Sequence, residues 1–118
     1  MQVLICDDEP SIRVLFRNAF ERAGAGVVEA SDGDECIRAV GESRPDLVVL
    51  DLYMPRRDGF STLAALREQD PGLPVVMVSA IAAVEVLRRG KALGADGCFD
   101  KMAFLGRIPS MVTRFSAA

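Results

Sequence analysis

The residues best suited to chemistry in this chain stand where short apolar runs end. The first run leads into Asp7 and Asp8, the third ends at Asp51, the fourth meets Ser79, and the fifth leads to Lys101. A lone carboxylate buried at a strand end costs several kcal/mol unless something pairs with it. Asp51 therefore either sits in solvent or is one part of a site.

Three acids, one hydroxyl and one cation at a common edge would narrow the chemistry. Two carboxylates about 4 Å apart repel by roughly 4 kcal/mol at an effective dielectric constant of about 20, so three acids together require a cation. The chain has no His, and hard oxygen ligands without His or thiolate favour Mg²⁺. Asp51 is then a possible nucleophile, because a carboxylate can attack phosphorus and form an aspartyl phosphate. Mg²⁺ and Lys101 would neutralise charge on the phosphoryl oxygens.

Each of these residues also has a purely structural explanation, which the sequence leaves open. Asp8, shortly before Pro10, has the type and place of a helix N-cap. Asp51 could be a turn residue, Ser79 a cap for the next helix, and Lys101 a solvated charge at a strand end. Their joint placement is what favours one shared site.

The elements that must position these residues alternate between strand and helix. Apolar runs predict five strands, at 3–6, 26–30, 47–50, 75–78 and 96–100. Segments with helical spacing of apolar residues follow them, at 12–23, 32–43, 60–68, 83–93 and 104–115. Five such units with continuously apolar strands predict a parallel sheet covered by helices on both faces. In such a sheet, ligands bind beyond the carboxyl ends of the strands.

Two helices carry more detailed expectations. The first has an apolar stripe made of Ile12, Leu15, Phe16, Ala19, Phe20 and Ala23. The last contains Pro109, which inside a helix would lose a hydrogen bond and clash with the carbonyl of Leu105. We therefore expect the regular part of the last helix to begin near Ile108.

Composition limits the class of protein. The 118 residues, half of them apolar, are enough for one domain, which we place at 1–118. A net charge of −3 and a pI near 4.9 give no general reason to bind nucleic acid directly or an anionic membrane. The three Cys are odd in number and far apart, which disfavours a disulfide scaffold or a zinc site. No apolar run approaches a spanning helix and no basic leader precedes the first strand, so we expect a cytoplasmic protein.

Four segments together resemble the receiver domain of two-component response regulators. They are VLICDDEP, VVLDLYMPRRDGF, LPVVMVSA and GADGCFDK, and the resemblance covers essentially the whole chain. It implies a doubly wound, flavodoxin-like α/β fold with five parallel strands in the order 2-1-3-4-5. It also implies a phosphorylatable signalling switch, either a stand-alone regulator or one domain of a longer protein.

The resemblance gives the acidic residues specific roles. Asp51 would accept a phosphoryl group from a phosphohistidine of a sensor histidine kinase or histidine phosphotransfer protein. Asp8 and Asp51 would bind Mg²⁺ through their carboxylates, Tyr53 through its backbone carbonyl, and Asp7 directly or through water.

The same resemblance implies how the switch works. Lys101 would pair with the phosphoryl oxygens, and Ser79 would swing its hydroxyl onto one of them. This movement would change the face formed by the fourth helix, the fifth strand and the last helix, which binds an output protein that the sequence does not identify. The state of assembly, monomer or phosphorylation-dependent dimer, is open.

This chain departs from the family pattern at two positions near the lysine. Cys98 stands where receiver domains usually have Tyr or Phe, a ring that moves with the Ser or Thr. Phe99 is a poor substitute, because strand alternation points it to the opposite face. Met102 follows the lysine where Pro is usual, which makes a cis peptide bond very unfavourable. These departures leave the aromatic half of the switch open.

Bulky residues also bear on the lifetime of the phosphoryl group. Tyr53 and Ile81 match family positions that flank the approach of hydrolytic water, so we predict slow self-dephosphorylation.

Two groups of basic residues have no assigned role, Arg56 with Arg57 and the RRGK segment at 88–91. They are either partner-binding charges or, as charge runs usually are, solvated faces.

Two rival functions remain open. A phosphatase with an aspartyl-phosphate intermediate would share the chemistry, but such enzymes typically carry a second acid two residues after the nucleophile, where this chain has Tyr53. A pseudo-receiver scaffold would normally lose an acid or the lysine, and none is lost. We therefore expect a switch that catalyses only its own phosphorylation and slow self-dephosphorylation, not an enzyme in the ordinary sense.

Overall fold

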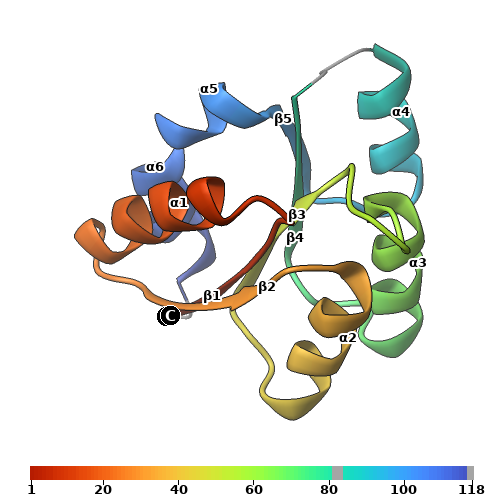
Figure 1. The fold of residues 1–118 in the computed structure, drawn as a ribbon, viewed down its shortest axis with the longest axis horizontal. Helices are drawn as coiled ribbons and strands as arrows, with labels where there is room; N and C mark the ends of the chain where they lie inside the picture. Colours follow the sequence, from red (N-terminus) through yellow and green to blue (C-terminus); the bar gives the residue numbers. More distant parts are fainter. Residues whose placement is uncertain (81–83, 117–118) are drawn as a thin grey trace.

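The computed structural model describes residues 1–80 and 84–116, and these form an α/β fold around one five-stranded sheet. The strands are β1 (Gln2–Cys6), β2 (Gly26–Ala30), β3 (Leu47–Asp51), β4 (Val75–Ser79) and β5 (Gly97–Asp100). Neighbouring strands pair in parallel in the order β2-β1-β3-β4-β5 (Figure 1). The predicted doubly wound sheet and its strand order are confirmed.

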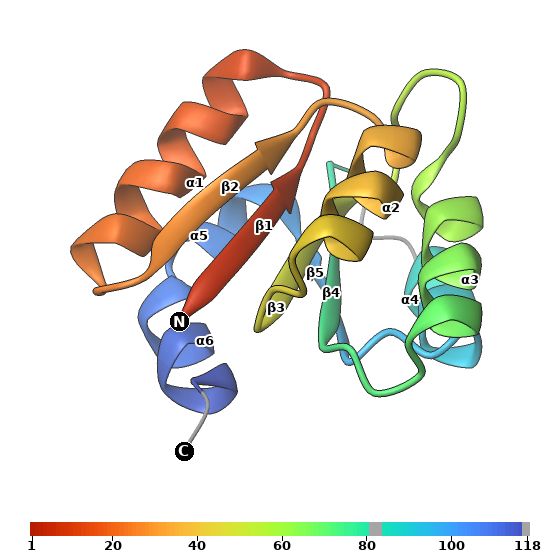
Figure 2. The ribbon, with the colours of Figure 1, turned by 90° about the horizontal axis from the view of Figure 1, so that it is seen from below.

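Helices cover both faces of the sheet. They are α1 (Pro10–Arg22), α2 (Gly33–Glu42), α3 (Gly59–Gln69), α4 (Val84–Ala92), α5 (Lys101–Leu105) and α6 (Ile108–Phe115). Two perpendicular views place α1, α5 and α6 on one face and α2, α3 and α4 on the other (Figure 1, Figure 2). The expected start of the fourth helix, at residue 83, lies outside the described residues. In the part of the chain that is described, no helix is both long and apolar enough to cross a bilayer.

Alternation along the strands divides the apolar residues between two cores. In β1, Val3 and Ile5 join the cluster beneath α1, α5 and α6. Leu4 and Cys6 join the cluster beneath α2, α3 and α4. Cys6 and Cys36 are buried free thiols in that second cluster. The continuously apolar strands are explained, because each successive side chain meets a covered face.

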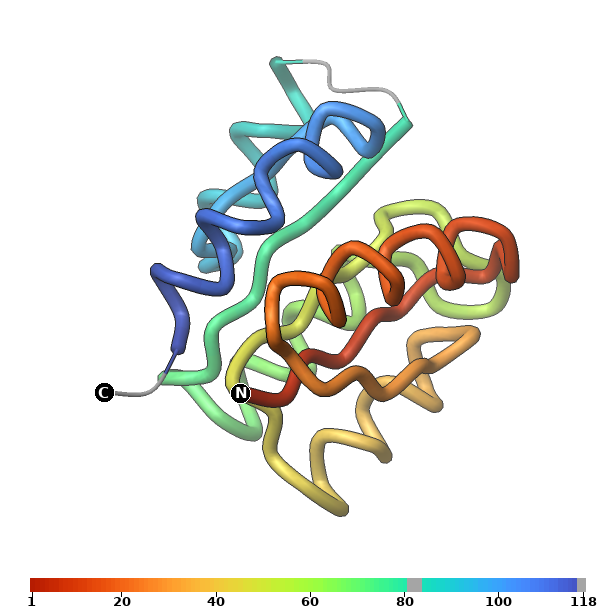
Figure 3. The backbone as a smooth tube through the Cα atoms, turned by 90° about the vertical axis from the view of Figure 1, so that its left-hand side faces the viewer, coloured from red at the N-terminus to blue at the C-terminus, as the bar shows by residue number. Residues whose placement is uncertain are grey.

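Helix α1 runs back along β1 after the turn that follows the strand (Figure 3). Its two phenylalanines are fully buried, and the ring centroids of Phe16 and Phe20 lie 5.6 and 6.2 Å from that of Phe104. The expected apolar stripe was wrong at Leu15, which is 37% exposed. That stripe spans more of the helix circumference than the sheet and α6 cover.

The region after β5 contains two short helices where the sequence predicted one. The prediction that the regular part begins at Ile108 is confirmed, and Pro109 lies in the first turn of α6, where no hydrogen bond is lost. The separate helix α5 was not predicted. It begins directly at Lys101, because the Asp100 carboxylate accepts the N–H of Ala103 at 2.9 Å and caps the helix.

The two residues in the middle of β5 point to opposite faces, as predicted. Phe99 lies 5.4 Å from Phe104 between ring centroids, on the α5 side. Cys98 packs against the other cluster, under α4. There it meets Gly90, which is buried in α4, and a Cβ added to Gly90 would lie 2.6 Å from the Cys98 sulfur. The small residue at 98 and the glycine at 90 therefore fit each other.

This fit makes Gly90→Ala destabilising. Alanine ordinarily stabilises a helix by about 1 kcal/mol over glycine, but here we expect the free energy of unfolding to fall by about 1–3 kcal/mol because the added methyl overpacks the α4–β5 contact. In a Cys98→Ala background the loss should shrink by at least about 1 kcal/mol. Urea unfolding of the four proteins measures both values.

Gly41→Ala provides the matched control. It also lies in a helix, α2, but its added Cβ would come no closer than 3.4 Å to a neighbouring atom, the Gln69 side-chain nitrogen. We expect this variant to be as stable as the parent or more so. Equal effects of the two glycine substitutions would show that Cys98 does not set the spacing beneath α4.

Candidate functional site

The carboxyl ends of β1 and β3 bring three acids together. One carboxylate oxygen from each of Asp7, Asp8 and Asp51 lies within 4.8 Å of the other two. Asp7 and Asp51 are buried, at 1% and 3% exposure, whereas Asp8 is exposed. The predicted convergence of these acids at one edge is confirmed, and the alternative that Asp51 is a solvated turn residue is wrong.

Lys101 reaches into this cluster from the first residue of α5. Its Nζ lies 2.7 Å from Asp7 Oδ2 and 3.3 Å from Asp51 Oδ2, and the lysine side chain is only 7% exposed. The alternative that Lys101 is a solvated charge is therefore wrong. A buried ammonium survives in this place because two buried carboxylates compensate it.

The alternative that Asp8 caps the first helix is also wrong. The residue before α1 is Glu9, whose side chain makes no capping hydrogen bond. The Glu9 N–H instead donates to Asp7 Oδ1 at 2.9 Å. Asp8 is thus left at the mouth of the site, beside two buried acids, without a capping role.

Ser79 and Tyr53 lie at the same edge of the sheet. Ser79 is the last residue of β4, is 3% exposed and pairs in register with Asp100, the neighbour of Lys101. The backbone of Tyr53 helps to lower the pKa of Asp51, against the larger effect of burial, and Tyr53 is 56% exposed. Ile81 lies outside the described residues, so slow self-dephosphorylation remains a prediction.

The loop between β3 and α3 holds Asp51 from the other side. Gly59 donates its N–H to the Leu52 carbonyl at 2.7 Å, and an added Cβ there would lie 2.5 Å from the Asp51 carbonyl oxygen. Asp58 caps α3 by accepting the Ser61 N–H at 2.8 Å. The DG pair of the sequence therefore starts α3 and lets it approach the strand end.

The two arginines in this loop face α2. Arg56 has a left-handed φ of +69° and lies 3.5 Å from Asp32, and Arg57 lies 3.0 Å from Asp34. The Arg56 side chain is 78% exposed and that of Arg57 35%, and ion pairs with exposed partners contribute little to stability. This favours the interpretation of Arg56 as a solvated charge, whereas Arg57 is half-buried against the start of α2.

Burial dominates the electrostatics of the acids. Desolvation, followed by the charge of Asp7, raises the pKa of Asp51 to about 6, although Lys101 opposes this. Desolvation also raises the pKa of Asp7. Burial alone would lower the pKa of Lys101, but its contacts with Asp7 and Asp51 raise it instead. The cluster therefore has more buried negative charge than one lysine compensates.

The donor set fits a hard divalent cation. Three carboxylates converge with no thiolate among them. Asp7 Oδ2 has its ion pair with Lys101, but among the described residues it finds no hydrogen bond of acceptable geometry. A buried carboxylate oxygen without a hydrogen bond, next to two further carboxylates, is the arrangement that an oxygen-preferring ion satisfies.

Sequence reasoning missed two residues that contact this site. Glu9 Oε1 lies 3.4 Å from Lys101 Nζ at the exposed side. Arg13, from the second turn of α1, donates from Nη1 to the backbone carbonyl of Asp7 at 2.7 Å. Glu9 directly follows the acid pair and could have been considered with it. Arg13 carries no signal in the sequence, because any helix surface offers arginines.

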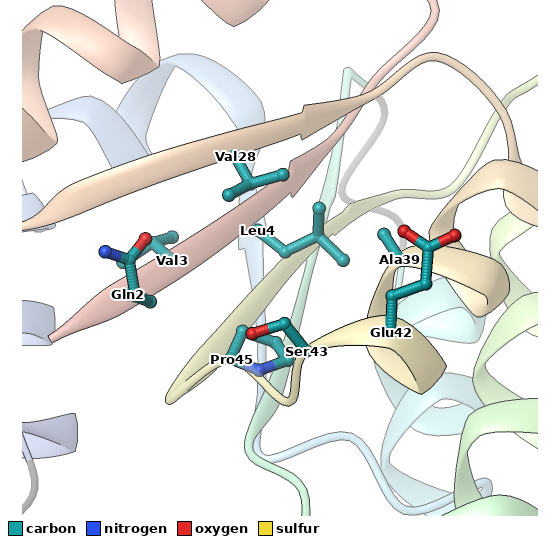
Figure 4. Close-up of a pocket in the computed structure, with 8 residues that line it drawn as sticks. All are labelled: Gln2, Val3, Leu4, Val28, Ala39, Glu42, Ser43 and Pro45. Atoms are coloured by element: carbon teal, nitrogen blue, oxygen red, sulfur yellow. The ribbon is translucent and has the colours of Figure 1, made fainter.

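A separate hollow lies at the other end of the sheet. It has a volume of about 150 Å³ and is lined by Gln2, Val3, Leu4, Val28, Ala39, Glu42, Ser43 and Pro45 (Figure 4). Gln2 begins β1, whereas the acids follow the end of that strand. The hollow therefore shares no residue with the acidic cluster.

Comparison with known proteins agrees with the site. The sequence matches the response regulator receiver domain over residues 3–113. It is 39% identical over 99 residues to the probable transcriptional regulatory protein TcrX of Mycobacterium tuberculosis, covering 84% of this chain and 42% of that protein. It is 30% identical over 114 residues to sporulation initiation phosphotransferase F of Bacillus subtilis, covering 97% of this chain and 92% of that protein.

The fold is also similar to that of known structures. The chemotaxis protein CheY4 of Vibrio cholerae superposes with a TM-score of 0.88 at 30% identity, covering 97% of each chain. The chain thus spans less than half of a regulator such as TcrX but nearly all of phosphotransferase F and CheY4. The matched segment contains every acid of the cluster as well as Lys101. This chain belongs to the family of response regulator receiver domains.

Proposed function

We propose that the chain is a phosphorylatable switch in which Asp51 accepts a phosphoryl group from the phosphohistidine of a sensor histidine kinase or histidine phosphotransfer protein. The observation that carries this proposal is the burial of Asp51 between a second acid, Asp7, and the ammonium of Lys101. A carboxylate held this way has a cation at hand for the charge of an incoming phosphoryl group.

The proposal includes a magnesium ion at the acidic cluster. Asp8 and Asp51 would hold it through their carboxylates, Tyr53 through its backbone carbonyl, and Asp7 directly or through water. When bound, the ion supplies positive charge that neutralises phosphoryl oxygens. Asp8 is the most accessible of the three acids, which suits a ligand that an ion meets first.

The chain's own groups do the remaining work. Asp51 attacks phosphorus with a carboxylate oxygen as the bond from phosphorus to the donor histidine breaks. Lys101 then exchanges part of its contact with Asp51, 3.3 Å away, for the phosphoryl oxygens. The buried position of Asp7 and Asp51 excludes much of the water that would compete with the donor.

The output of the switch would pass through Ser79 and the face made by α4, β5 and the helices after it. Ser79 would turn its hydroxyl onto a phosphoryl oxygen and move the segment that follows β4. Because Cys98 replaces the usual ring, this route relies on Ser79 and on the spacing beneath α4. The output protein is unidentified, and assembly as monomer or phosphorylation-dependent dimer stays a prediction.

Phosphoryl capture tests the proposal directly. With Mg²⁺ and acetyl phosphate, we expect the parent to gain one phosphoryl group, seen as a mass increase, and Asp51→Asn to gain none. Beryllofluoride with Mg²⁺ should bind the parent and not the variant. Asp46→Asn, a carboxylate that accepts the Gln2 N–H far from the cluster, should behave like the parent. Continuous hydrolysis of a small phosphoester would indicate a phosphatase, and no capture at all would indicate a scaffold.

The raised pKa of Asp51 predicts a stability difference that depends on pH. Because the pKa rises from 3.8 to about 6 on folding, the folded state binds more protons between these values, and ionisation costs stability as pH increases through 6. We therefore expect the free energy of unfolding of Asp51→Asn in EDTA to rise relative to that of the parent as pH increases. The difference should grow by roughly 2–3 kcal/mol between about pH 4 and pH 7. Urea unfolding across this range measures the gain. A constant difference would mean that Asp51 ionises normally.

Lys101 competes with a metal ion for the same carboxylates. Removing it in Lys101→Met should tighten Mg²⁺ binding by about tenfold or more, because contacts at 2.7 and 3.3 Å no longer neutralise the acids. The same variant should lose stability in EDTA and capture phosphate poorly. Lys91, the only other lysine in the sequence, is exposed on α4, and Lys91→Met should change none of these values. Weaker Mg²⁺ binding in Lys101→Met would contradict the competition.

A further inference from the structure

Arg13, a cationic side chain of α1, contacts the backbone of the acidic turn at residues 7–9 but none of the carboxylates of that turn. Arg13 donates from Nη1 to the backbone carbonyl of Asp7 at 2.7 Å. Its Nε donates to Glu29 Oε1 at 2.9 Å, and the Arg13 side chain is only 18% exposed. The guanidinium thus joins the edge strand β2 to the backbone at the end of β1.

The turn that Arg13 contacts has few other supports. It runs from the end of β1 at Cys6 to the start of α1 at Pro10, and α1 has no side-chain cap. The Asp7 N–H donates to the Ala30 carbonyl at 3.1 Å, and the Glu9 N–H donates to the Asp7 carboxylate. The Glu9 carbonyl accepts the N–H groups of Ile12 and Arg13 at 3.1 and 3.2 Å, so none of these bonds involves the Asp7 carbonyl. The carbonyl of Asp7 is the part of this turn that Arg13 fixes.

Fixing that carbonyl also fixes the next residue. The Asp7 carbonyl and the Asp8 N–H belong to one planar peptide unit. A bond that holds the carbonyl oxygen therefore limits rotation of the whole plane, and with it the direction of the Asp8 side chain. Asp8 is exposed, so packing does not orient it.

Glu29 keeps Arg13 in place. It lies on β2 opposite Ile5, on the face covered by α1, and it accepts from both Arg13 and Arg17, the latter at 2.6 Å. Burial alone would raise the pKa of Glu29, but these two arginines hold it below its usual value. One carboxylate thus compensates two arginines only in part, so the charge of Arg13 has to be separated from its geometric contact with Asp7 by a variant that removes a charge from the same Glu29.

We propose that Arg13 is a positioning residue for the metal site: by anchoring the Asp7 carbonyl to Glu29, it presets the direction from which Asp8 meets a divalent cation. The inference rests on the proposed function for the identity of that cation. Residues that orient ligands in this way typically contribute 10–100-fold to metal affinity.

The chain offers a closely matched control for this role. Arg17 comes one turn later on α1 and pairs with the same Glu29, but among the described residues it makes no hydrogen bond or ion pair with residues 7–9, and its side chain is 34% exposed. Arg13→Met and Arg17→Met each remove one arginine from Glu29. Only the first removes the anchor on Asp7.

Magnesium titration, followed by the amide NMR shifts of the cluster, compares the two variants. We expect Arg13→Met to weaken Mg²⁺ binding by about tenfold or more and Arg17→Met by less than about twofold, at similar losses of stability in urea. Arg13→Lys should recover part of the affinity, since its ammonium can still donate to the carbonyl. Equal affinities in the Arg13→Met variant and the parent, or equal weakening by both methionine variants, would overturn the proposal.

A second readout needs no metal. In EDTA, amide hydrogen exchange at Asp7 and Glu9, whose N–H groups donate to the Ala30 carbonyl and to Asp7 Oδ1, should be at least about tenfold faster in Arg13→Met than in Arg17→Met or the parent, because the turn is released. Unchanged exchange at these amides would also overturn the proposal. If the parent itself fails to bind Mg²⁺, the proposed function is wrong, and the exchange measurement still decides the role of Arg13.

Discussion

The ion pairs of Lys101 with Asp7 and Asp51 are the interaction on which the rest of this structure depends. Charges this deeply buried persist only with close partners, and here one ammonium lies 2.7 and 3.3 Å from two carboxylates. The compensation is incomplete, because Asp8 adds a third acid and burial raises the pKa of Asp51. The protein can therefore fold with these charges buried, and the site keeps an excess of negative charge. This excess is the condition for binding a cation.

The fold supplies this arrangement by bringing strand ends together. Strands β1 and β3 are neighbours at the centre of the sheet, β4 follows, and β5 carries the chain into Lys101. The two apolar cores hold these strands from both faces, so in the central strands β1, β3 and β4 the polar side chains stand only at the ends. The separation of core and site explains how buried charge is tolerated beside a dense apolar interior.

Much of this could be predicted from the sequence because it depends on periodicity and on strand ends. The five strands, their order and the meeting of Asp7, Asp8 and Asp51 all follow from apolar runs and from a known family pattern. Helix α5 could not be predicted that way, since a capping bond from Asp100 decides its start. Leu15 was misplaced because helical spacing does not say how wide the covering surface is.

The contact of Arg13 could not be predicted either, for a different reason. It depends on where a long side chain reaches in three dimensions, and neither spacing nor composition records this. Glu9, which directly follows the acid pair, could have been considered with it. The fit of Gly90 against Cys98 is another case, because the residue at 98 limits what α4 can carry at 90. Such a dependence is visible only once the two elements are seen packed together.

The loop after Asp51 carries a consequence for how this sequence can vary. At position 59 any side chain would collide with the backbone at the end of β3, so only glycine fits there. At position 56 the reverse holds: the backbone adopts a conformation that glycine or asparagine accepts more readily than arginine. Three residues apart, one position thus accepts glycine alone, and at the other a replacement of arginine would relieve backbone strain.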